Sequence, residues 1–158
     1  MKRVFIALLV VTGLALVAGC DIGGDDRLSN EEFKERATEI DKRVSDSFDA
    51  VFEEIGNPDK LGNKPVPEKA KTALAEAAQT EQEAVDELDD LNPPEQGQEA
   101  LDQLVEVAGT QADRLTEAAE NPDLTGNELL EAFDADDVDK PINELIKLDL
   151  WPPEEEGQ

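Results

Sequence analysis

Residues 67–91 of the chain read PEKAKTALAEAAQTEQEAVDELDDL. Steps of four and three residues separate a set of mostly apolar positions with one polar member, Glu81: Ala70, Leu74, Ala77, Glu81, Ala84, Leu88 and Leu91. This heptad spacing places the set on one face of a helix, as in helical bundles and coiled coils. Pro67 is suited to the first helical turn, and Asn92-Pro93-Pro94 ends the helix. The stretch therefore predicts a long helix that packs along one side against other helices.

The segment before this stretch carries the same pattern. Ser29 with Glu32 forms a capping box, and Leu28 with Phe33 forms a hydrophobic staple. Apolar residues then recur at helical spacing, and Gly56-Asn57-Pro58 supplies the stop: Phe33, Ala37, Ile40, Val44, Phe48, Val51, Phe52 and Ile55. The pattern predicts a helix of about 26 residues, ~39 Å long.

Further helices are expected after residue 91. Residues 95–120 carry apolar positions at the same spacing, again with one polar member, Gln111. Thr125 with Glu128 forms a second capping box, which opens a short helix, and a last helix spans about residues 139–148. Strand signals are nearly absent. The expected fold class is therefore all-α, an antiparallel helical bundle of three long helices plus one or two short C-terminal helices.

The expected folded body spans residues 29–150 and is followed by a disordered acidic tail, residues 151–158. The two later long helices are rich in Ala and lack aromatic residues, so their axes can approach closely. We expect the bulk of the core to come from the Phe residues of the first helix, with Phe133 and Trp151 filling one end. Such a thin core predicts modest stability.

The composition excludes several classes of function. The 158 residues include no His and a single Cys, which rules out His-bearing metal sites, Ser-His-Asp or Cys-His nucleophiles and an intramolecular disulfide. The chain has 40 acidic and 14 basic residues and a net charge of −26, so nucleic acid is not an expected partner. Met1 is the only Met, and haem ligation is not expected. The composition favours a protein that is not an enzyme.

Residues 1–20 read MKRVFIALLVVTGLALVAGC. Lys2 and Arg3 form a positive start, and residues 4–17 form an apolar stretch of 14 residues. This is the layout of a secretory signal peptide. A transmembrane helix is disfavoured because about 18–20 apolar residues are needed to span a bilayer.

The end of the stretch, Val17-Ala18-Gly19-Cys20, resembles the lipobox of bacterial lipoproteins. The resemblance implies a signal peptide of residues 1–19, cleavage between Gly19 and Cys20, a diacylglyceryl group on the Cys20 thiol and often an N-acyl group on its amine. Two or more acyl chains anchor a protein stably where one is marginal. No other cofactor is expected. The implied location is the extracytoplasmic face of the cell membrane.

The mature chain would begin with the lipidated Cys and a short spacer, residues 20–28. The spacer after the Cys reaches at most ~28 Å when fully extended, so the folded body would lie close to the bilayer. The opening Leu28-Ser29-x-Glu31-Glu32-Phe33 and the break Leu91-Asn92-Pro93-Pro94 are similar to those of small helical lipoproteins of actinobacteria. These motifs are too short to imply a function.

Glu81 and Gln111 interrupt otherwise apolar helix faces. One interpretation is a buried polar layer that binds a small ligand or a cation between helices. The other is that the seven-residue pattern drifts on straight helices and leaves both residues at the edge of the face. The sequence favours the edge position, because a lone buried carboxylate is strongly unfavourable.

An acidic run near the C-terminus is a weak candidate for Ca²⁺ or Mg²⁺, which take oxygen ligands: Asp134, Asp136, Asp137 and Asp139. The spacing does not match an EF-hand loop, because Asp139 stands where Gly is required and Leu145 where Glu is required. A solvated acidic loop that caps the following helix is favoured instead.

Charge is distributed unevenly along the mature chain. Residues 20–71 hold 14 acidic and 9 basic residues, whereas residues 72–139 hold 21 acidic residues and only Arg114. The acidic part is either a surface for a basic protein partner or, as the sequence favours, a solvated surface suited to a salty or calcium-rich exterior.

The expected function is a membrane-anchored extracytoplasmic lipoprotein that acts as a non-catalytic binding or envelope-interaction module. A small-solute or divalent-cation (Ca²⁺ or Mg²⁺) binding protein is the alternative, and a carboxylate-based enzyme comes third. The oligomeric state stays open.

Overall fold

The computed structural model describes residues 27–56, 60–134 and 138–152. Five α-helices follow one another in this part of the chain, which contains no β-strand: α1 (Asn30–Ile55), α2 (Glu68–Asp89), α3 (Gln98–Glu120), α4 (Gly126–Phe133) and α5 (Asp139–Lys147). A short 3-10 helix, η2 (Glu95–Gly97), leads into α3. The predicted all-α fold class is confirmed, with three long helices and two short ones.

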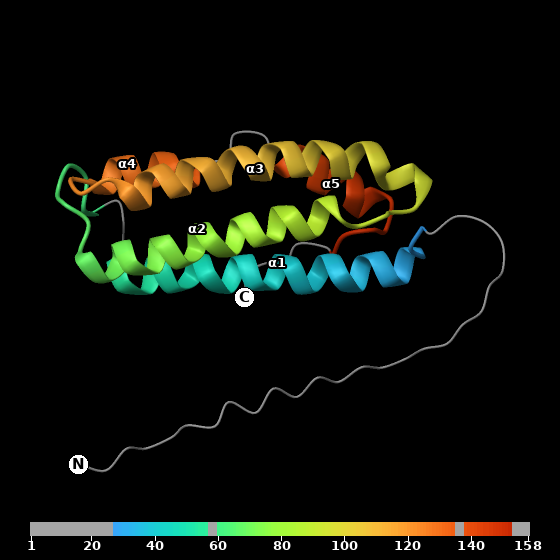
Figure 1. Cartoon of the computed structure of the whole chain (residues 1–158), viewed down its shortest axis with the longest axis horizontal. Coiled ribbons are helices and arrows are strands. Elements are labelled where there is room, and N and C mark those ends of the chain that lie inside the picture. Colours follow the sequence, from blue (N-terminus) through green and yellow to red (C-terminus); the bar gives the residue numbers. More distant parts are fainter. Residues whose placement is uncertain (1–26, 57–59, 135–137, 153–158) are drawn as a thin grey trace, which may run out of the picture.

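The three long helices lie side by side, and each runs antiparallel to the next along the chain (Figure 1). α2 packs directly against both α1 and α3. Its contact face carries Ala70, Ala77 and Ala84, which are buried and small enough for the neighbouring helices to approach closely. The small residues of the heptad thus place α2 in the centre of the bundle.

The remaining side of the bundle, between α3 and α1, is covered by two short helices. α4 and α5 both pack against α3, at opposite ends of it (Figure 1). α4 reaches α1 through Phe133. The centroid of its ring lies 5.0 Å from the ring centroid of Phe48 and 4.9 Å from that of Phe52. The turn after α5 reaches α1 through the ion pair of Asp149 with Lys34.

The buried apolar residues form two clusters. The cluster around α5, here called the α5 half, contains residues from the N-terminal part of α1 onward: Phe33, Ala37, Ile40, Ala84, Leu88, Leu91, Ala100, Leu101, Leu104, Leu145, Leu150 and Trp151. The cluster around α4, the α4 half, lies at the other end: Val51, Val66, Ala70, Leu74, Ala77, Ala78, Leu115, Ala118, Leu124, Leu129 and Ala132. Phe133 packs on the α4 half and Trp151 belongs to the α5 half, so the expectation that they fill one end together is wrong.

Both predicted capping boxes are present. The Ser29 hydroxyl accepts a hydrogen bond from the Glu32 backbone N–H at 3.3 Å, and the Glu32 carboxylate accepts one from the Ser29 N–H at 3.1 Å. Thr125 and Glu128 repeat the arrangement at the start of α4. The hydroxyls of Ser29 and Thr125 also donate to these carboxylates, at 2.8 and 2.7 Å. The hydroxyl hydrogen bonds, followed by those from the backbone N–H groups, lower the pKa of both glutamates because they favour the charged carboxylate.

Several details differ from the predictions. Pro67 is the N-cap of α2 and precedes its first turn. Val138 is the N-cap of α5 and makes no side-chain capping hydrogen bond, so the expected acidic cap is absent there. Asp139 lies in the first turn instead, where its negative charge interacts favourably with the helix dipole. Trp151 is only 5% exposed, because its ring packs into the α5 half. The folded body therefore extends past the predicted boundary at residue 150.

The two ends of the bundle are tied by hydrogen bonds between connections. At the α5 end, the Leu28 N–H donates to Asn92 O at 2.8 Å, and the Arg27 guanidinium donates to Pro93 O at 2.9 Å. At the α4 end, the Val66 N–H donates to Leu124 O at 2.8 Å. The residues just before α2 thus lie against the α3–α4 connection, and the residues just before α1 lie against the α2–α3 connection.

Candidate functional site

A polar layer separates the two halves of the core. Glu81 on α2 is 5% exposed and Gln111 on α3 is 8% exposed. The favoured interpretation of the sequence, which placed both residues at the edge of their helix faces, is wrong. They are covered because the end of α4 and the start of α5 lie over the three long helices at this level, which the heptad pattern of α2 and α3 cannot show.

Gln111 has a structural explanation. Its side-chain amide lies 3.5 Å from the backbone carbonyl of Phe133, the last residue of α4. Arg114, one turn further along α3, donates to Asp134 O at 2.8 Å. The last carbonyls of a helix lack partners within the helix, so these two side chains of α3 stabilise the end of α4.

Glu81 has no comparable explanation. Its Oε2 atom is buried and is the one side-chain nitrogen or oxygen in the described residues that is buried without a hydrogen-bond partner. Burial raises the pKa of Glu81 from 4.5 to about 7, because desolvation disfavours the charged carboxylate. A strongly shifted acid without a structural partner is characteristic of functional sites.

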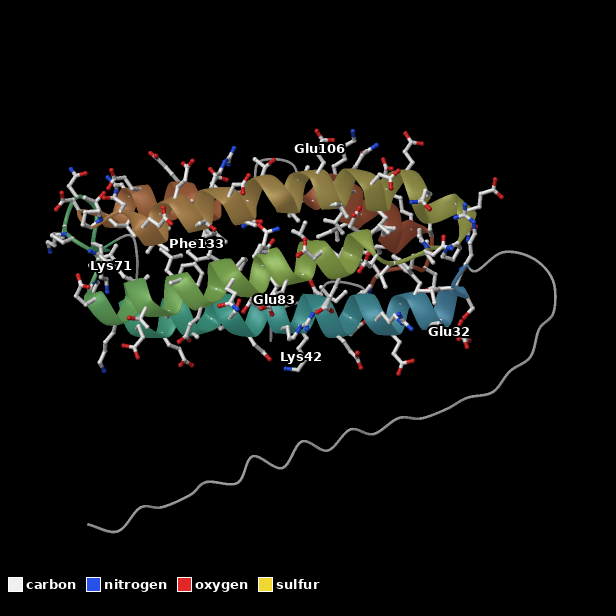
Figure 2. The ribbon with its side chains drawn as sticks, in the orientation of Figure 1. Glu32, Lys42, Lys71, Glu83, Glu106 and Phe133 are labelled. Carbon is white, nitrogen blue, oxygen red and sulfur yellow. The ribbon has the colours of Figure 1, made fainter. Side chains whose placement is uncertain are left out.

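Glu81 lines a cavity of about 450 Å³ at the level of the polar layer. This volume falls within the range of about 300–1,000 Å³ that is typical of small-molecule sites. All five helices and the segment after α5 contribute to its walls, which are mostly apolar and include three aromatic rings: Phe48 from α1, Phe133 from α4 and Trp151. Figure 2 shows Phe133 between the helix layers, whereas Glu106 on α3 and Lys42 on α1 point away from the bundle.

The charged groups that line this cavity are all acidic. Besides Glu81 they are Asp41 on α1, Asp134 at the end of α4 and Asp139 at the start of α5, and none of the Lys and Arg residues that the structure describes lines it. Partial burial raises the pKa of Asp41. Ser45 and Gln111 add neutral polar groups. The cavity therefore presents carboxylates and aromatic rings, a combination that favours a positively charged occupant.

The acidic run predicted as a weak metal site is only partly described. Asp134 and Asp139 both lie at this cavity, while Asp136 and Asp137 lie outside the described residues. In residues 27–56, 60–134 and 138–152 no three Asp, Glu, Cys or His residues come together in a way that could hold a metal ion. The described carboxylates thus lie at different places in the cavity wall and do not form a metal-binding group.

A larger hollow of about 710 Å³ lies on the outside of α1 and α2. Four of its charged side chains pair with one another. Arg43 donates two hydrogen bonds to Glu87, at 2.8 and 3.0 Å, and Lys42 donates to Asp46 at 2.8 Å. Because Arg43 bridges α1 to α2 in this way, we interpret the hollow as a salt-bridged surface groove.

The predicted lipidation site, Gly19 and Cys20, lies outside the described residues. Among the helices that the structure does describe, none is both long enough and apolar enough to span a bilayer.

Sequence reasoning singled out Glu81, Gln111, Asp134 and Asp139, but it favoured an edge position for the first two and did not bring the four together. Phe48, Phe133 and Trp151 were expected in the core, and Asp41 and Ser45 look like ordinary residues on the polar side of an amphipathic helix. Helical spacing gave no sign that they meet, since residues 41–48 and 133–151 come together only through the packing of α4 and α5.

Comparisons with protein-family models, with curated proteins and with solved structures gave no significant match to this chain.

Proposed function

We propose that the chain is a lipid-anchored protein of the extracytoplasmic membrane face that binds a small ligand inside its helical bundle and does not transform it. The observation that carries the binding part is the cavity of about 450 Å³ with the unpartnered carboxylate of Glu81 in its wall.

The cavity and the carboxylate are both unfavourable in the empty protein. Apolar cavity walls that face water are unfavourable, and a buried carboxylate without a partner loses its hydration. A larger apolar residue in the wall would fill the cavity, and a neutral side chain at position 81 would remove the buried carboxylate. Local departures of this kind from good packing are expected at functional sites, where a ligand supplies the missing contacts.

A thermal-unfolding screen tests the binding part. The full chain is heated with organic ammonium ions, neutral alcohols and carboxylates of matched size, and with Ca²⁺ or Mg²⁺ alone. A ligand that binds only the folded state stabilises it, by about 2.7 kcal/mol at a hundred times its dissociation constant. We expect at least one organic class to raise the midpoint. No shift with any organic class contradicts the proposal, and a shift with Ca²⁺ or Mg²⁺ alone supports the divalent-cation alternative.

The anchoring part rests on the sequence of residues 1–20. Cys20→Ala should abolish metabolic labelling of the protein with a fatty-acid analogue, because the acceptor thiol is lost. Asp21→Asn, at the neighbouring position, is the matched control and should keep the label. Unchanged labelling of the Cys20→Ala variant refutes a lipid anchor at this residue.

A second candidate function is the binding of a basic protein by the acidic α2–α3 surface. It is favoured by the charge of residues 72–139, in which Arg114 is the only basic residue. Arg114 is already engaged with the end of α4. A pull-down from envelope extract at low and high salt tests it, since binding that depends on such charges weakens as salt screens them.

A further inference from the structure

We propose that the ligand of the cavity is a monovalent organic cation with an apolar body, an aliphatic or aromatic ammonium ion whose charged end meets the carboxylate of Glu81. This inference rests on the proposed function and names the chemical class of its ligand.

The positive charge follows from the lining. Glu81, Asp41, Asp134 and Asp139 contribute carboxylates from four segments, and no basic residue in the described part of the chain lines the cavity. An anion would meet only like charges, and a neutral apolar molecule would leave Glu81 Oε2 without a partner. An ammonium group next to the Glu81 carboxylate can donate a charge-assisted hydrogen bond to it, which is among the stronger interactions available in a protein interior.

The apolar body follows from the shape and the walls. Around Glu81 the cavity is lined by Ala84, Val85 and Leu88 of the same helix and by Leu104 and Ala108 of α3. The volume of about 450 Å³ is many times that of a water molecule, about 30 Å³. The rings of Phe48, Phe133 and Trp151 add faces on which a cation is favoured.

A metal ion fits this site less well. Ca²⁺ takes six to eight oxygen ligands, and Mg²⁺ demands an octahedral set. The described residues bring no three candidate ligands together, and a single ion would leave the apolar part of the cavity empty. An organic cation uses both the carboxylate and the apolar walls.

The protonation of Glu81 gives the binding a pH dependence. With its pKa raised to about 7 in the empty protein, Glu81 is largely neutral below that pH and largely charged above it. The other charged groups at the cavity are Asp41 from α1, Asp134 after α4 and Asp139 from α5, and α3 contributes only the neutral Gln111. A cation should therefore bind more tightly as pH rises from 6 to 8, because Glu81 then becomes an anion.

Trp151 provides the readout, because it lines the cavity and is the only Trp in a chain without Tyr. The full chain in phosphatidylcholine vesicles is titrated at pH 8 with butylammonium, cyclohexylammonium and phenethylammonium. Each is paired with the alcohol and the carboxylate of the same body, and vesicles without protein serve as the blank. We expect at least one ammonium ion to change the emission of Trp151 saturably, and to bind at least tenfold more tightly than its alcohol and its carboxylate.

Two variants of α2 complete the test. Glu81→Gln should weaken binding of that ammonium ion at least tenfold and remove the gain between pH 6 and pH 8, because the amide keeps the shape and loses the charge. Glu76→Gln changes an exposed glutamate of the same helix, and it should leave both the affinity for the ammonium ion and its pH dependence unchanged. Circular dichroism confirms that both variants are folded.

The possible failures are distinguishable. If an alcohol or a carboxylate binds as tightly as the ammonium ion, or if Glu81→Gln binds the ammonium ion unchanged, the cationic ligand is refuted while a small-molecule site remains. If no probe of any class binds, the proposed function fails together with this inference.

Discussion

The α5 half and the α4 half of the bundle are built from the same three long helices, yet they pack differently. The α5 half contains three Ala among its buried residues, and it is filled by Phe33, Trp151 and several Leu. The α4 half contains five Ala, and its aromatic residues, Phe48 and Phe133, are only partly buried beside it. The bulk of the core therefore lies at the α5 end.

The difference comes from the short helices. α4 begins with a capping box, and at its end the side chains of Gln111 and Arg114 donate hydrogen bonds to the backbone oxygens of Phe133 and Asp134. α5 has no side-chain cap and is held by burial of Leu145, Leu150 and Trp151. Two short helices, each stabilised in a different way, thus cover one side of the bundle. The cavity with Glu81 lies at the level between α4 and α5. Under the proposed anchoring, the α5 half is also the one next to the spacer and the membrane.

The largest effect is expected from Phe33→Ala, in the α5 half. Phe33 is fully buried, and removing a buried aromatic ring lowers the free energy of unfolding by about 3–5 kcal/mol. Because α1, α2 and α3 span both halves, unfolding should remain one transition. Urea titrations followed by circular dichroism and by Trp151 fluorescence should therefore coincide for this variant.

Phe52→Ala in the α4 half is the matched control. Phe52 is half-buried against Phe133, so we expect roughly half the loss, about 1.5–2.5 kcal/mol. A larger loss at Phe52 than at Phe33 would reverse the comparison of the halves. Separate transitions by the two probes would show that the halves unfold independently.

The next effect concerns the layer between the halves. Burial raises the pKa of Glu81 from 4.5 in the unfolded chain to about 7 in the folded protein. Stability from this group is therefore fully present below pH 4.5 and is lost as pH rises through about 7. The shift corresponds to about 3 kcal/mol. Glu81→Gln should match the parent near pH 4 and exceed its free energy of unfolding by about 3 kcal/mol at pH 8.5.

The difference between parent and variant isolates this residue. Asp41, Asp134 and Asp139 also line the cavity, and all three are present in both proteins. Urea unfolding at four pH values measures the difference, with Glu76→Gln as the exposed control. A difference that stays constant from pH 4 to pH 8.5 would mean that Glu81 is not desolvated.

The smallest effect compares a glycine in each half. A Cβ on Gly126 would collide with Leu61 and with the backbone of Gly62, whereas a Cβ on Gly97 would collide with the end of the Leu150 side chain. Backbone cannot yield as a side chain can, and overpacking costs about 1–3 kcal/mol. Gly126→Ala should lose about 2–3 kcal/mol and Gly97→Ala about 1 kcal/mol in thermal unfolding. An equal loss would show that Leu150 is as rigid as the Leu61–Gly62 backbone.

Much of the fold could be predicted because its signals are local. The capping boxes at Ser29 and Thr125 depend on residues three positions apart, and the Pro-containing stops act within a few residues. Ion pairs were less predictable. Glu39 lies one turn from Arg43 on α1, yet Arg43 makes its hydrogen bonds to Glu87 on α2, and Glu39 contributes only electrostatically.

The candidate site was predictable only in part. Glu81 and Gln111 were identified as polar intruders, but the spacing could not decide between a buried layer and an edge position. Whether a heptad position is buried depends on what covers it, and here the cover is the end of α4 and the start of α5.

Local patterns in the sequence place the helix ends to within a few residues and identify the apolar face of each helix, because propensity, capping and periodicity operate over short distances along the chain. The sequence also excluded all chemistry that needs His. Only the tertiary structure decided that the fourth side of the bundle is closed in two pieces and that the core divides into two halves. It also decided that Glu81 lies buried without a partner between them. Burial and cavities arise from contacts between residues far apart in the chain, and no local pattern records them.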